Sequence, residues 1–107
     1  MASQQRTVDF LIEQIGHAGR VSSKKMFGEY GIYFDDKMVA MVCDDQLYVK
    51  PTSAGRAQFE RPVEASPYPG AKPCLLVAGE LWDDHEWLGR LIAVSAMELP
   101  QPKKKKP

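Results

Sequence analysis

The densest polar cluster of the chain is the run Asp83, Asp84, His85 and Glu86. Carboxylates and an imidazole bind divalent metals, so one interpretation of this run is a metal-binding patch. The other is the start of a helix, where carboxylates accept hydrogen bonds from unpaired backbone N–H groups and interact favourably with the helix dipole. Consecutive helical residues point in different directions, whereas histidine pairs that bind metal need i, i+4 spacing. We therefore favour the helix start and expect no bound metal.

The histidines and cysteines also lack the pattern of a catalytic site. His17 and His85 are the only two histidines, and we expect them in different settings, with His17 near the end of the first helix. Cys43 and Cys74 lie 31 positions apart among apolar residues, where a thiol packs as a small hydrophobic group. The nucleophile motif G-x-S-x-G, the P-loop and G-x-G-x-x-G are absent from the sequence. The sequence therefore predicts a protein that is not an enzyme and has no cofactor.

A ligand site is the alternative for Lys25, Tyr48, Lys50 and Arg56. Lysine and tyrosine side chains at strand ends can converge on a small anionic ligand or on a nucleic-acid backbone. In the other interpretation, Tyr48 packs against the sheet while the lysines solvate its edge. A depression shared by these side chains would favour the ligand site.

The charge distribution argues against a broad DNA-binding face. Fourteen basic residues balance fourteen acidic ones, but four of the basic residues are Lys103 to Lys106. The rest of the chain carries ten basic and fourteen acidic residues, a net charge of −4. Sequence-independent DNA binding depends on many contacts between basic side chains and phosphates. We expect direct DNA binding to be weak or absent, and residues 100–107 to form a disordered basic tail after a domain of residues 1–99.

Membrane and export signals are also absent from the sequence. No apolar run approaches the ~20 residues that span a bilayer. The start, MASQQRTVDF, lacks a basic stretch followed by an apolar one. We therefore expect a cytoplasmic protein with no membrane partner.

The first element that positions these residues is a helix. Its apolar residues follow the i, i+3, i+4, i+7 spacing: Val8, Leu11, Ile12 and Ile15. Ser3 or Thr7 could supply the N-cap, and Gly19 is placed to end the helix.

Residues 23–50 have the character of three antiparallel strands. The segments MFGEYGIYF, MVAMVC and QLYVK are rich in β-branched and aromatic residues and are separated by short, Asp-rich connections. Turns this short join antiparallel neighbours only. Gly28 and Gly31 interrupt the first segment at a spacing that indicates a bulge or a close backbone approach.

A short helix is predicted next, from Thr52 or Ser53 to about Glu60, because Pro62 would stop it. Phe59 is its expected anchor. A proline-rich loop follows this helix.

The last third of the chain predicts a strand and a well-capped helix. CLLVAGEL indicates a fourth strand, with a short fifth strand near Leu81. Asp83 and Glu86 have the spacing of a capping box, and Trp82 and Trp87 that of a hydrophobic staple. The order α-β-β-β-α-β(-β)-α predicts a two-layer α+β fold, an antiparallel sheet of four to five strands with helices packed on it.

The segment KKMFGEYGIYFDDKMVAMVCDDQLYVKPT resembles the signature of the N-terminal domain of the TfoX/Sxy family. A basic residue precedes MFG, a second glycine follows three positions on, and LYVK closes the third strand segment. With the flanking helices, the resemblance covers roughly residues 4–98. The resemblance implies a two-layer fold similar to that of secretion-chaperone-like domains. It provides no agreed catalytic or ligand residues.

The best-known members of that family are bacterial cytoplasmic co-regulators that help a cyclic-AMP receptor protein switch on DNA-uptake genes. Those regulators carry a second, C-terminal domain, whereas this chain ends in a lysine run. The resemblance therefore implies a non-enzymatic protein-interaction module with a transcription-related protein partner. Homodimerisation through an exposed strand or helix face is a further expectation, because a small sheet leaves edges to cover.

Overall fold

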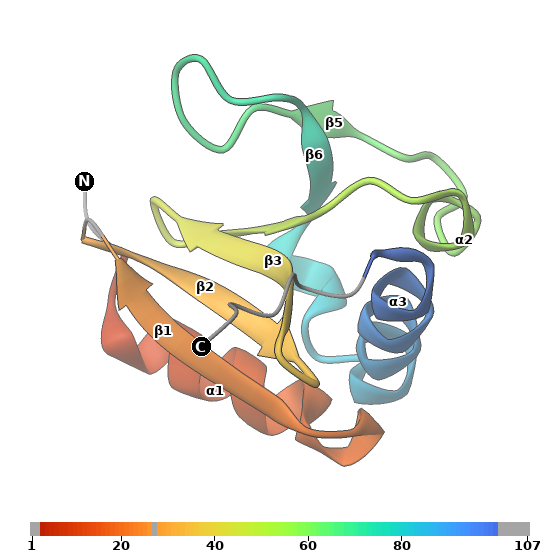
Figure 1. The fold of residues 1–107 in the computed structure, drawn as a ribbon, viewed down its shortest axis with the longest axis horizontal. Helices are drawn as coiled ribbons and strands as arrows, with labels where there is room; N and C mark the ends of the chain where they lie inside the picture. The colour runs from red at the N-terminus through yellow and green to blue at the C-terminus, as the bar shows by residue number, and fades with distance from the viewer. Residues whose placement is uncertain (1–2, 27, 101–107) are drawn as a thin grey trace, which may run out of the picture.

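The computed structural model describes residues 3–26 and 28–100 (Figure 1). Its elements follow one another as α1 (Gln5–Ile15), β1 (Val21–Met26), β2 (Glu29–Phe34), β3 (Lys37–Cys43), β4 (Gln46–Val49), α2 (Ser53–Arg56), β5 (Glu64–Ala65), β6 (Cys74–Val77) and α3 (His85–Glu98). Two 3-10 turns, η1 (Gly16–Ala18) and η2 (Gly79–Leu81), extend α1 and precede α3. The first helical segment thus ends directly before Gly19, where the sequence places its end. The predicted tail after Pro100 lies outside the described residues.

The strands of the described chain form one antiparallel sheet in the order β1-β2-β3-β4-β6-β5. The predicted α+β class is therefore confirmed, with six strands instead of four to five. The two additional strands are β1 and β5. β1 is mostly polar and exposed because it forms an edge of the sheet, so no apolar alternation marks it in the sequence.

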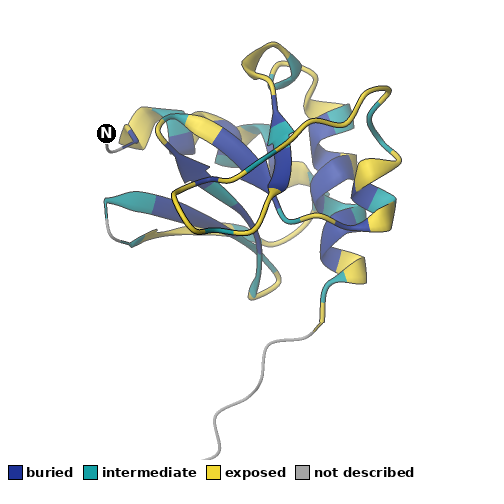
Figure 2. Ribbon diagram, turned by 90° about the horizontal axis from the view of Figure 1, so that it is seen from above, coloured by how far each residue is buried: buried dark blue, intermediate teal, exposed yellow. Residues whose placement is uncertain are grey.

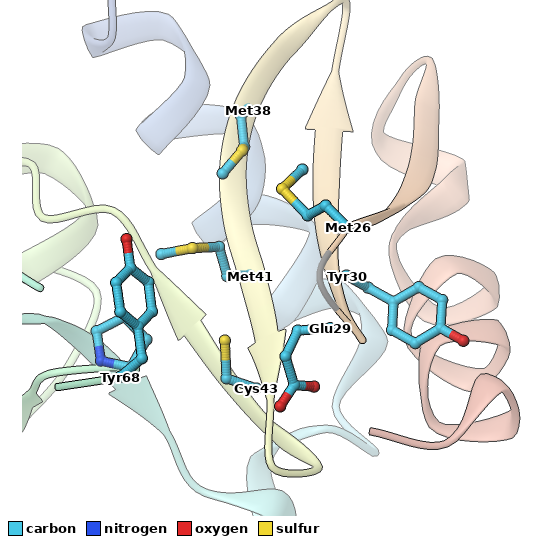
Figure 3. A pocket seen from close by; sticks show the side chains of 8 residues that line it. Met26, Glu29, Tyr30, Met38, Met41, Cys43 and Tyr68 are labelled. Atoms are coloured by element: carbon cyan, nitrogen blue, oxygen red, sulfur yellow. The ribbon is translucent and has the colours of Figure 1, made fainter. Parts of the chain in front are cut away.

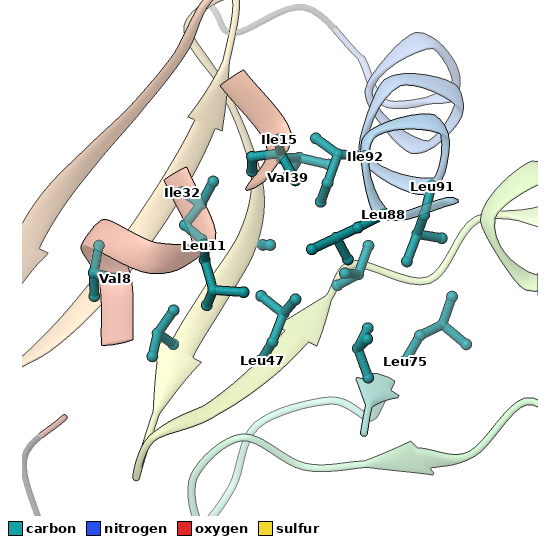
Figure 4. Close-up of a cluster of buried hydrophobic side chains, with 14 of the residues drawn as sticks. Val8, Leu11, Ile15, Ile32, Val39, Leu47, Leu75, Leu88, Leu91 and Ile92 are labelled. Atoms are coloured by element: carbon teal, nitrogen blue, oxygen red, sulfur yellow. The ribbon is translucent and has the colours of Figure 1, made fainter. Parts of the chain in front are cut away.

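One face of the sheet carries the main core. Apolar side chains from α1 and α3 meet inward-facing residues of β2, β3, β4 and β6 (Figure 4). The largest fully buried members include Leu11, Ile15, Ile32, Leu47, Leu75, Leu88, Leu91 and Ile92. Each such side chain contributes about 1.5–3 kcal/mol when it leaves water. The helices are therefore held against this face by burial of the stripe that the periodicity predicts.

The start of α1 is capped by a distant residue. Neither Ser3 nor Thr7 is the N-cap, which is Gln4 without a side-chain cap. Instead, Asp45 Oδ1 accepts hydrogen bonds from the Gln4 backbone N–H, at 2.8 Å, and from the Thr7 hydroxyl, at 3.0 Å. The Ser3 hydroxyl accepts a bond from the Asp45 backbone N–H at 2.9 Å. The β3–β4 turn thus anchors the N-terminus of the helix.

Two tight turns join β2, β3 and β4. Asp35 and Asp36 have φ values of 50° and 69°, and Asp44 and Asp45 have values of 52° and 57°. Two-residue loops with positive φ at both positions match the right-handed twist of the flanking strands. The Asp-rich connections between the three predicted strands are therefore hairpin turns.

The predicted first strand, MFGEYGIYF, contains all of β2 but only the last residue of β1, Met26. Gly28, with φ of 79°, lies in the connection between β1 and β2, so it belongs to a turn and not to a bulge. The irregular register lies later, between Ile32 and Tyr33, where β2 pairs with β3.

The segment after β4 differs from the prediction in three places. Thr52 caps α2 as expected, accepting a bond from the Gly55 N–H at 2.9 Å, but the helix ends at Arg56 and not near Glu60. The proline-rich loop contributes β5, which pairs with β6. Leu81 lies in a 3-10 turn and not in a strand.

The helix α3 begins one residue later than the capping box requires. Asp84 is its N-cap and accepts a bond from the Trp87 N–H at 3.1 Å, so Asp83 and Glu86 do not form the predicted pair. With Asp84 as the N-cap, Trp82 and Trp87 do not occupy the two staple positions. Each indole donates to a backbone carbonyl, Trp82 to Val77 and Trp87 to Gln58. Within the described ranges, no helix combines the length and apolarity that crossing a bilayer requires.

Candidate protein-interaction groove

The second face of the sheet is covered by a loop and not by a helix. On β3, β4 and β6, residues Met41, Tyr48 and Leu76 are cross-strand partners and therefore point to the same face. They belong to a cluster separate from the main core, together with Cys43 and Cys74. The connection between β5 and β6, residues 66–73, is mostly exposed (Figure 2). This face is the less protected side of the molecule.

A depression of about 470 Å³ opens beside this loop (Figure 3). Its lining is Met26, Glu29, Tyr30, Met38, Met41, Cys43, Pro67 and Tyr68. We call it the methionine groove. Methionine has an unbranched, polarizable side chain that adapts to partners of different shape. Three such side chains in one depression form a surface suited to apolar groups.

Gly31 provides room for two of these methionines. A Cβ atom at this position would lie 3.0 Å from Met26 Cε and 3.3 Å from Met38 Sδ. This is the close approach that the glycine spacing in the sequence indicates, and it allows the two side chains to lie over the β2 backbone.

Tyr68 forms one wall of the groove and is 55% exposed. It begins a tight turn in which the Ala71 N–H donates to the Tyr68 carbonyl at 3.1 Å. Gly70, with φ of 87°, supplies the left-handed residue of this turn. The Ser66 hydroxyl donates to the Ala71 carbonyl at 2.9 Å and closes the loop on itself. These bonds hold the backbone of the loop at Tyr68.

Glu29 provides the carboxylate of the groove. It accepts bonds from the Ser3 hydroxyl at 2.5 Å, from the Ser3 N–H at 2.9 Å and from the Asp44 N–H at 3.1 Å. Burial raises the pKa of Glu29, but the hydrogen bonds to Ser3 and Asp44 outweigh it and leave this pKa below its ordinary value of 4.5. The carboxylate is therefore ionised at neutral pH and already bonded.

The two thiols of this face are protonated at neutral pH. Cys43 and Cys74 are free and buried, as the sequence predicts. Burial raises both thiol pKa values, and the nearby Glu29 carboxylate adds to the effect at Cys43. Since the thiolate is the reactive form, these side chains act as apolar lining and not as nucleophiles.

A second depression, of about 380 Å³, adjoins the methionine groove. Met41 and Tyr68 line both. The other residues of the second depression are Lys50, Pro51, Ala71, Lys72, Pro73, Cys74 and Leu99. We call it the lysine depression, because its two charged side chains are both lysines.

The structure places the four predicted ligand residues on separate elements. Lys25 lies exposed on β1, three strand positions from β4, which is roughly 14 Å at normal strand spacing. Tyr48 is buried and donates to Gln46 Oε1 at 2.8 Å, and Arg56 forms an ion pair with Glu64. Lys50 lines the lysine depression. The sheet therefore separates Lys25 from the others, and Lys50 alone of the four lines either of these two depressions.

The two histidines lie side by side, contrary to the expectation of different settings. Their ring centroids are 5.3 Å apart, and His17 Nε2 lies 3.0 Å from the backbone carbonyl oxygen of His85. The contact joins η1 to the start of α3. Over residues 3–26 and 28–100, no group of three or more His, Cys, Asp or Glu side chains is arranged to hold a metal ion.

Sequence reasoning missed the methionine groove. The signal for it is the run MVAMVC, which is apolar at consecutive positions and not at alternate ones. A strand of this kind is buried on both faces, so it indicates something apolar on the second face of the sheet. Tyr68 gives no comparable signal, since its neighbours are turn residues.

The comparisons with known proteins identify the family of this chain. Residues 13–99 match the family model of the TfoX N-terminal domain. An uncharacterized 12.7 kDa protein encoded in the trpE 5' region of Spirochaeta aurantia is 41% identical over 106 residues, which cover 99% of this chain and 91% of the relative. The small helix-covered antiparallel sheet is thus that of a TfoX-type domain. The chain belongs to the TfoX N-terminal domain family.

Proposed function

We propose that this chain is a non-enzymatic protein-interaction module related to the bacterial co-regulators of competence and transcription, and that it binds a transcription-related protein through the methionine groove. The methionine groove is the observation that carries the proposal. Its three methionines and Tyr68 lie outside the main core that α1 and α3 cover. Family membership supports the link to transcription, because the best-known members assist a cyclic-AMP receptor protein.

The polar groups of the groove favour binding over catalysis. The Glu29 carboxylate is bonded to Ser3 and Asp44, and the Tyr30 hydroxyl donates to Gln5 Oε1 at 3.1 Å. The Cys43 thiol has a raised pKa. A general acid or base must be able to exchange a proton with a substrate. These groups are instead occupied in holding the fold, and the groove offers shape and apolar surface.

The test is direct association with a purified bacterial cyclic-AMP receptor protein, measured by sedimentation velocity. Met41→Glu places a charge among the apolar side chains of the groove and should abolish the complex. Met97→Glu is the matched control, because Met97 is 81% exposed on α3 and lies outside the groove. This variant should bind as the parent chain does.

Two results would contradict the proposal. One is the absence of any complex between the receptor protein and the parent chain at concentrations well above the dissociation constant of a typical transient interaction. The other is equal binding by both variants, which would move the contact away from the methionine groove. Thermal unfolding of each variant, measured in parallel, shows whether Met41→Glu remains folded.

A further inference from the structure

We infer that the segment bound in the methionine groove is an apolar peptide stretch followed by acidic residues, with its acidic end over the lysine depression. This inference rests on the proposed function and specifies the chemistry of the partner. It comes from two features of the surface, the continuity of the depressions and the position of their charges.

The two depressions form one path across the sheet. Met41 and Tyr68 line both of them, so an occupant that passes Tyr68 contacts both. The methionine groove supplies apolar side chains, whereas the lysine depression supplies Lys50 and Lys72. An extended segment crossing the loop would therefore meet apolar surface first and positive charge next.

The two lysines are available to a partner. Within the part of the chain that the structure describes, neither side-chain ammonium group forms a hydrogen bond or an ion pair. Arg56 pairs with Glu64, and Lys37 donates to the carbonyls of Ala96 and Leu99, so those cations are already used. Two lysines beside apolar walls attract a carboxylate more strongly than they would in open water, because water is partly displaced.

The opposite charge lies in the other depression. Glu29 is part of the methionine groove and is ionised at neutral pH because its pKa is lowered. A carboxylate of the partner placed there would be repelled. The surface therefore selects the direction of the bound segment as well as its composition.

The experiment uses methionine methyl signals as reporters. The full chain, labelled with ¹³C at the methionine methyl groups, is titrated with a leucine-rich peptide ending in glutamates and with the same peptide ending in glutamines. The signals of Met26, Met38 and Met41 should shift, while the signal of Met97 should not. The acidic peptide should bind at least about tenfold more tightly, equivalent to about 1.4 kcal/mol. Added salt should reduce that difference.

Charge reversal tests the lysine depression. Lys50→Glu combined with Lys72→Glu should remove the preference for the acidic peptide and leave binding of the glutamine peptide unchanged. Arg6→Glu combined with Arg90→Glu is the matched control, since both arginines are exposed on the helices and the change in net charge is the same. The control should keep the preference.

The outcomes separate the inference from the proposed function. If both peptides bind equally and shift the methionine signals of the groove, the inference of an acidic partner is wrong, but the groove remains a binding site. Binding of the acidic peptide without methionine shifts means only electrostatic association and also overturns the inference. Shifts that depend on protein concentration alone identify a second copy as the occupant. If no peptide moves the groove signals, the docking site itself is wrong.

Discussion

At the scale of the residue, Asp45 has two structural roles. It adopts a positive φ in the β3–β4 turn, and its carboxylate accepts bonds from the Gln4 N–H and the Thr7 hydroxyl. Asp45→Ala removes the two hydrogen bonds and leaves an alanine in the left-handed region. The lost helix cap costs about 1 kcal/mol of stability, and the strained alanine costs a similar amount. We expect a loss of about 2 kcal/mol in the free energy of unfolding, measured with urea. Asp45→Asn keeps the acceptor oxygen and tolerates the turn, so it should lose less than half as much.

Glu98 makes the stability of the fold depend on pH. Its carboxylate accepts bonds from the Ala54 N–H at 2.9 Å and the Ser53 N–H at 2.8 Å, which lower its pKa below the ordinary value of 4.5. A lowered pKa in the folded state means that the stabilisation is fully present above about pH 4.5 and is lost as the pH falls through the folded pKa. Glu98→Gln should therefore be less stable than the parent chain at pH 7, with the difference shrinking below pH 4.5.

Urea unfolding at a series of pH values measures this effect. Glu13→Gln serves as the control, because Glu13 is exposed on α1. A difference between Glu98→Gln and the parent chain that stays constant down to pH 3 would contradict the role given to this carboxylate.

At the scale of the element, Lys37 joins the β2–β3 hairpin to the end of α3. Its ammonium group donates to the Ala96 carbonyl at 2.8 Å and to the Leu99 carbonyl at 3.1 Å. The Ala96 carbonyl also accepts a bond from the Leu99 N–H at 3.3 Å, and the positive charge of Lys37 at this end of the helix interacts favourably with the helix dipole. Lys37→Met retains the apolar stem and should lower the free energy of unfolding by about 1–2 kcal/mol. Lys24→Met, on the exposed edge strand β1, should change it by less than about 0.5 kcal/mol.

The elements also show how far local sequence patterns predict this fold. The stripe of Val8, Leu11 and Ile15 predicts α1, and the Asp-rich connections predict the hairpins, because both signals are local. β1 and β5 are not predicted, because their residues show little alternation of apolar and polar side chains. Only their pairing with β2 and β6 defines them as strands. The cap of α1 was missed for the same reason, since Asp45 lies about 40 positions away.

The candidate site was less predictable than the fold. Lysine and tyrosine at strand ends predict an anion site formed by Lys25, Tyr48, Lys50 and Arg56. Strand order then determines which of them can meet, and two strands separate Lys25 from β4. The methionine groove depends on residues of β1, β2, β3 and the loop after β5, which only the register of the sheet brings together.

At the scale of the whole molecule, the two faces of the sheet are protected unequally. Helices cover one face, whereas the loop of residues 66–73 lies beside Cys43 and Cys74 on the other. Gly70→Ala forces an alanine to adopt φ of 87°. This strain should lower the free energy of local opening of the loop by about 1–2 kcal/mol. We expect the rate of thiol labelling under native conditions to rise by roughly 5–30-fold.

Gly79→Ala is the matched control for this measurement. An added Cβ meets no other atom within 4 Å at either glycine, but only Gly70 has a positive φ. Equal labelling rates for the two variants would show that the loop does not protect the thiols.

The strand order also has a consequence for how the chain reaches this structure. β1, β2, β3 and β4 pair with their immediate neighbours along the chain, through loops of a few residues. β6 is different, because it joins β4 only after the whole stretch of residues 50–73 has closed into a loop. Closing a long loop costs more chain entropy than closing a hairpin. The meander is therefore the natural nucleus of folding, and the strand that carries Cys74 is added late.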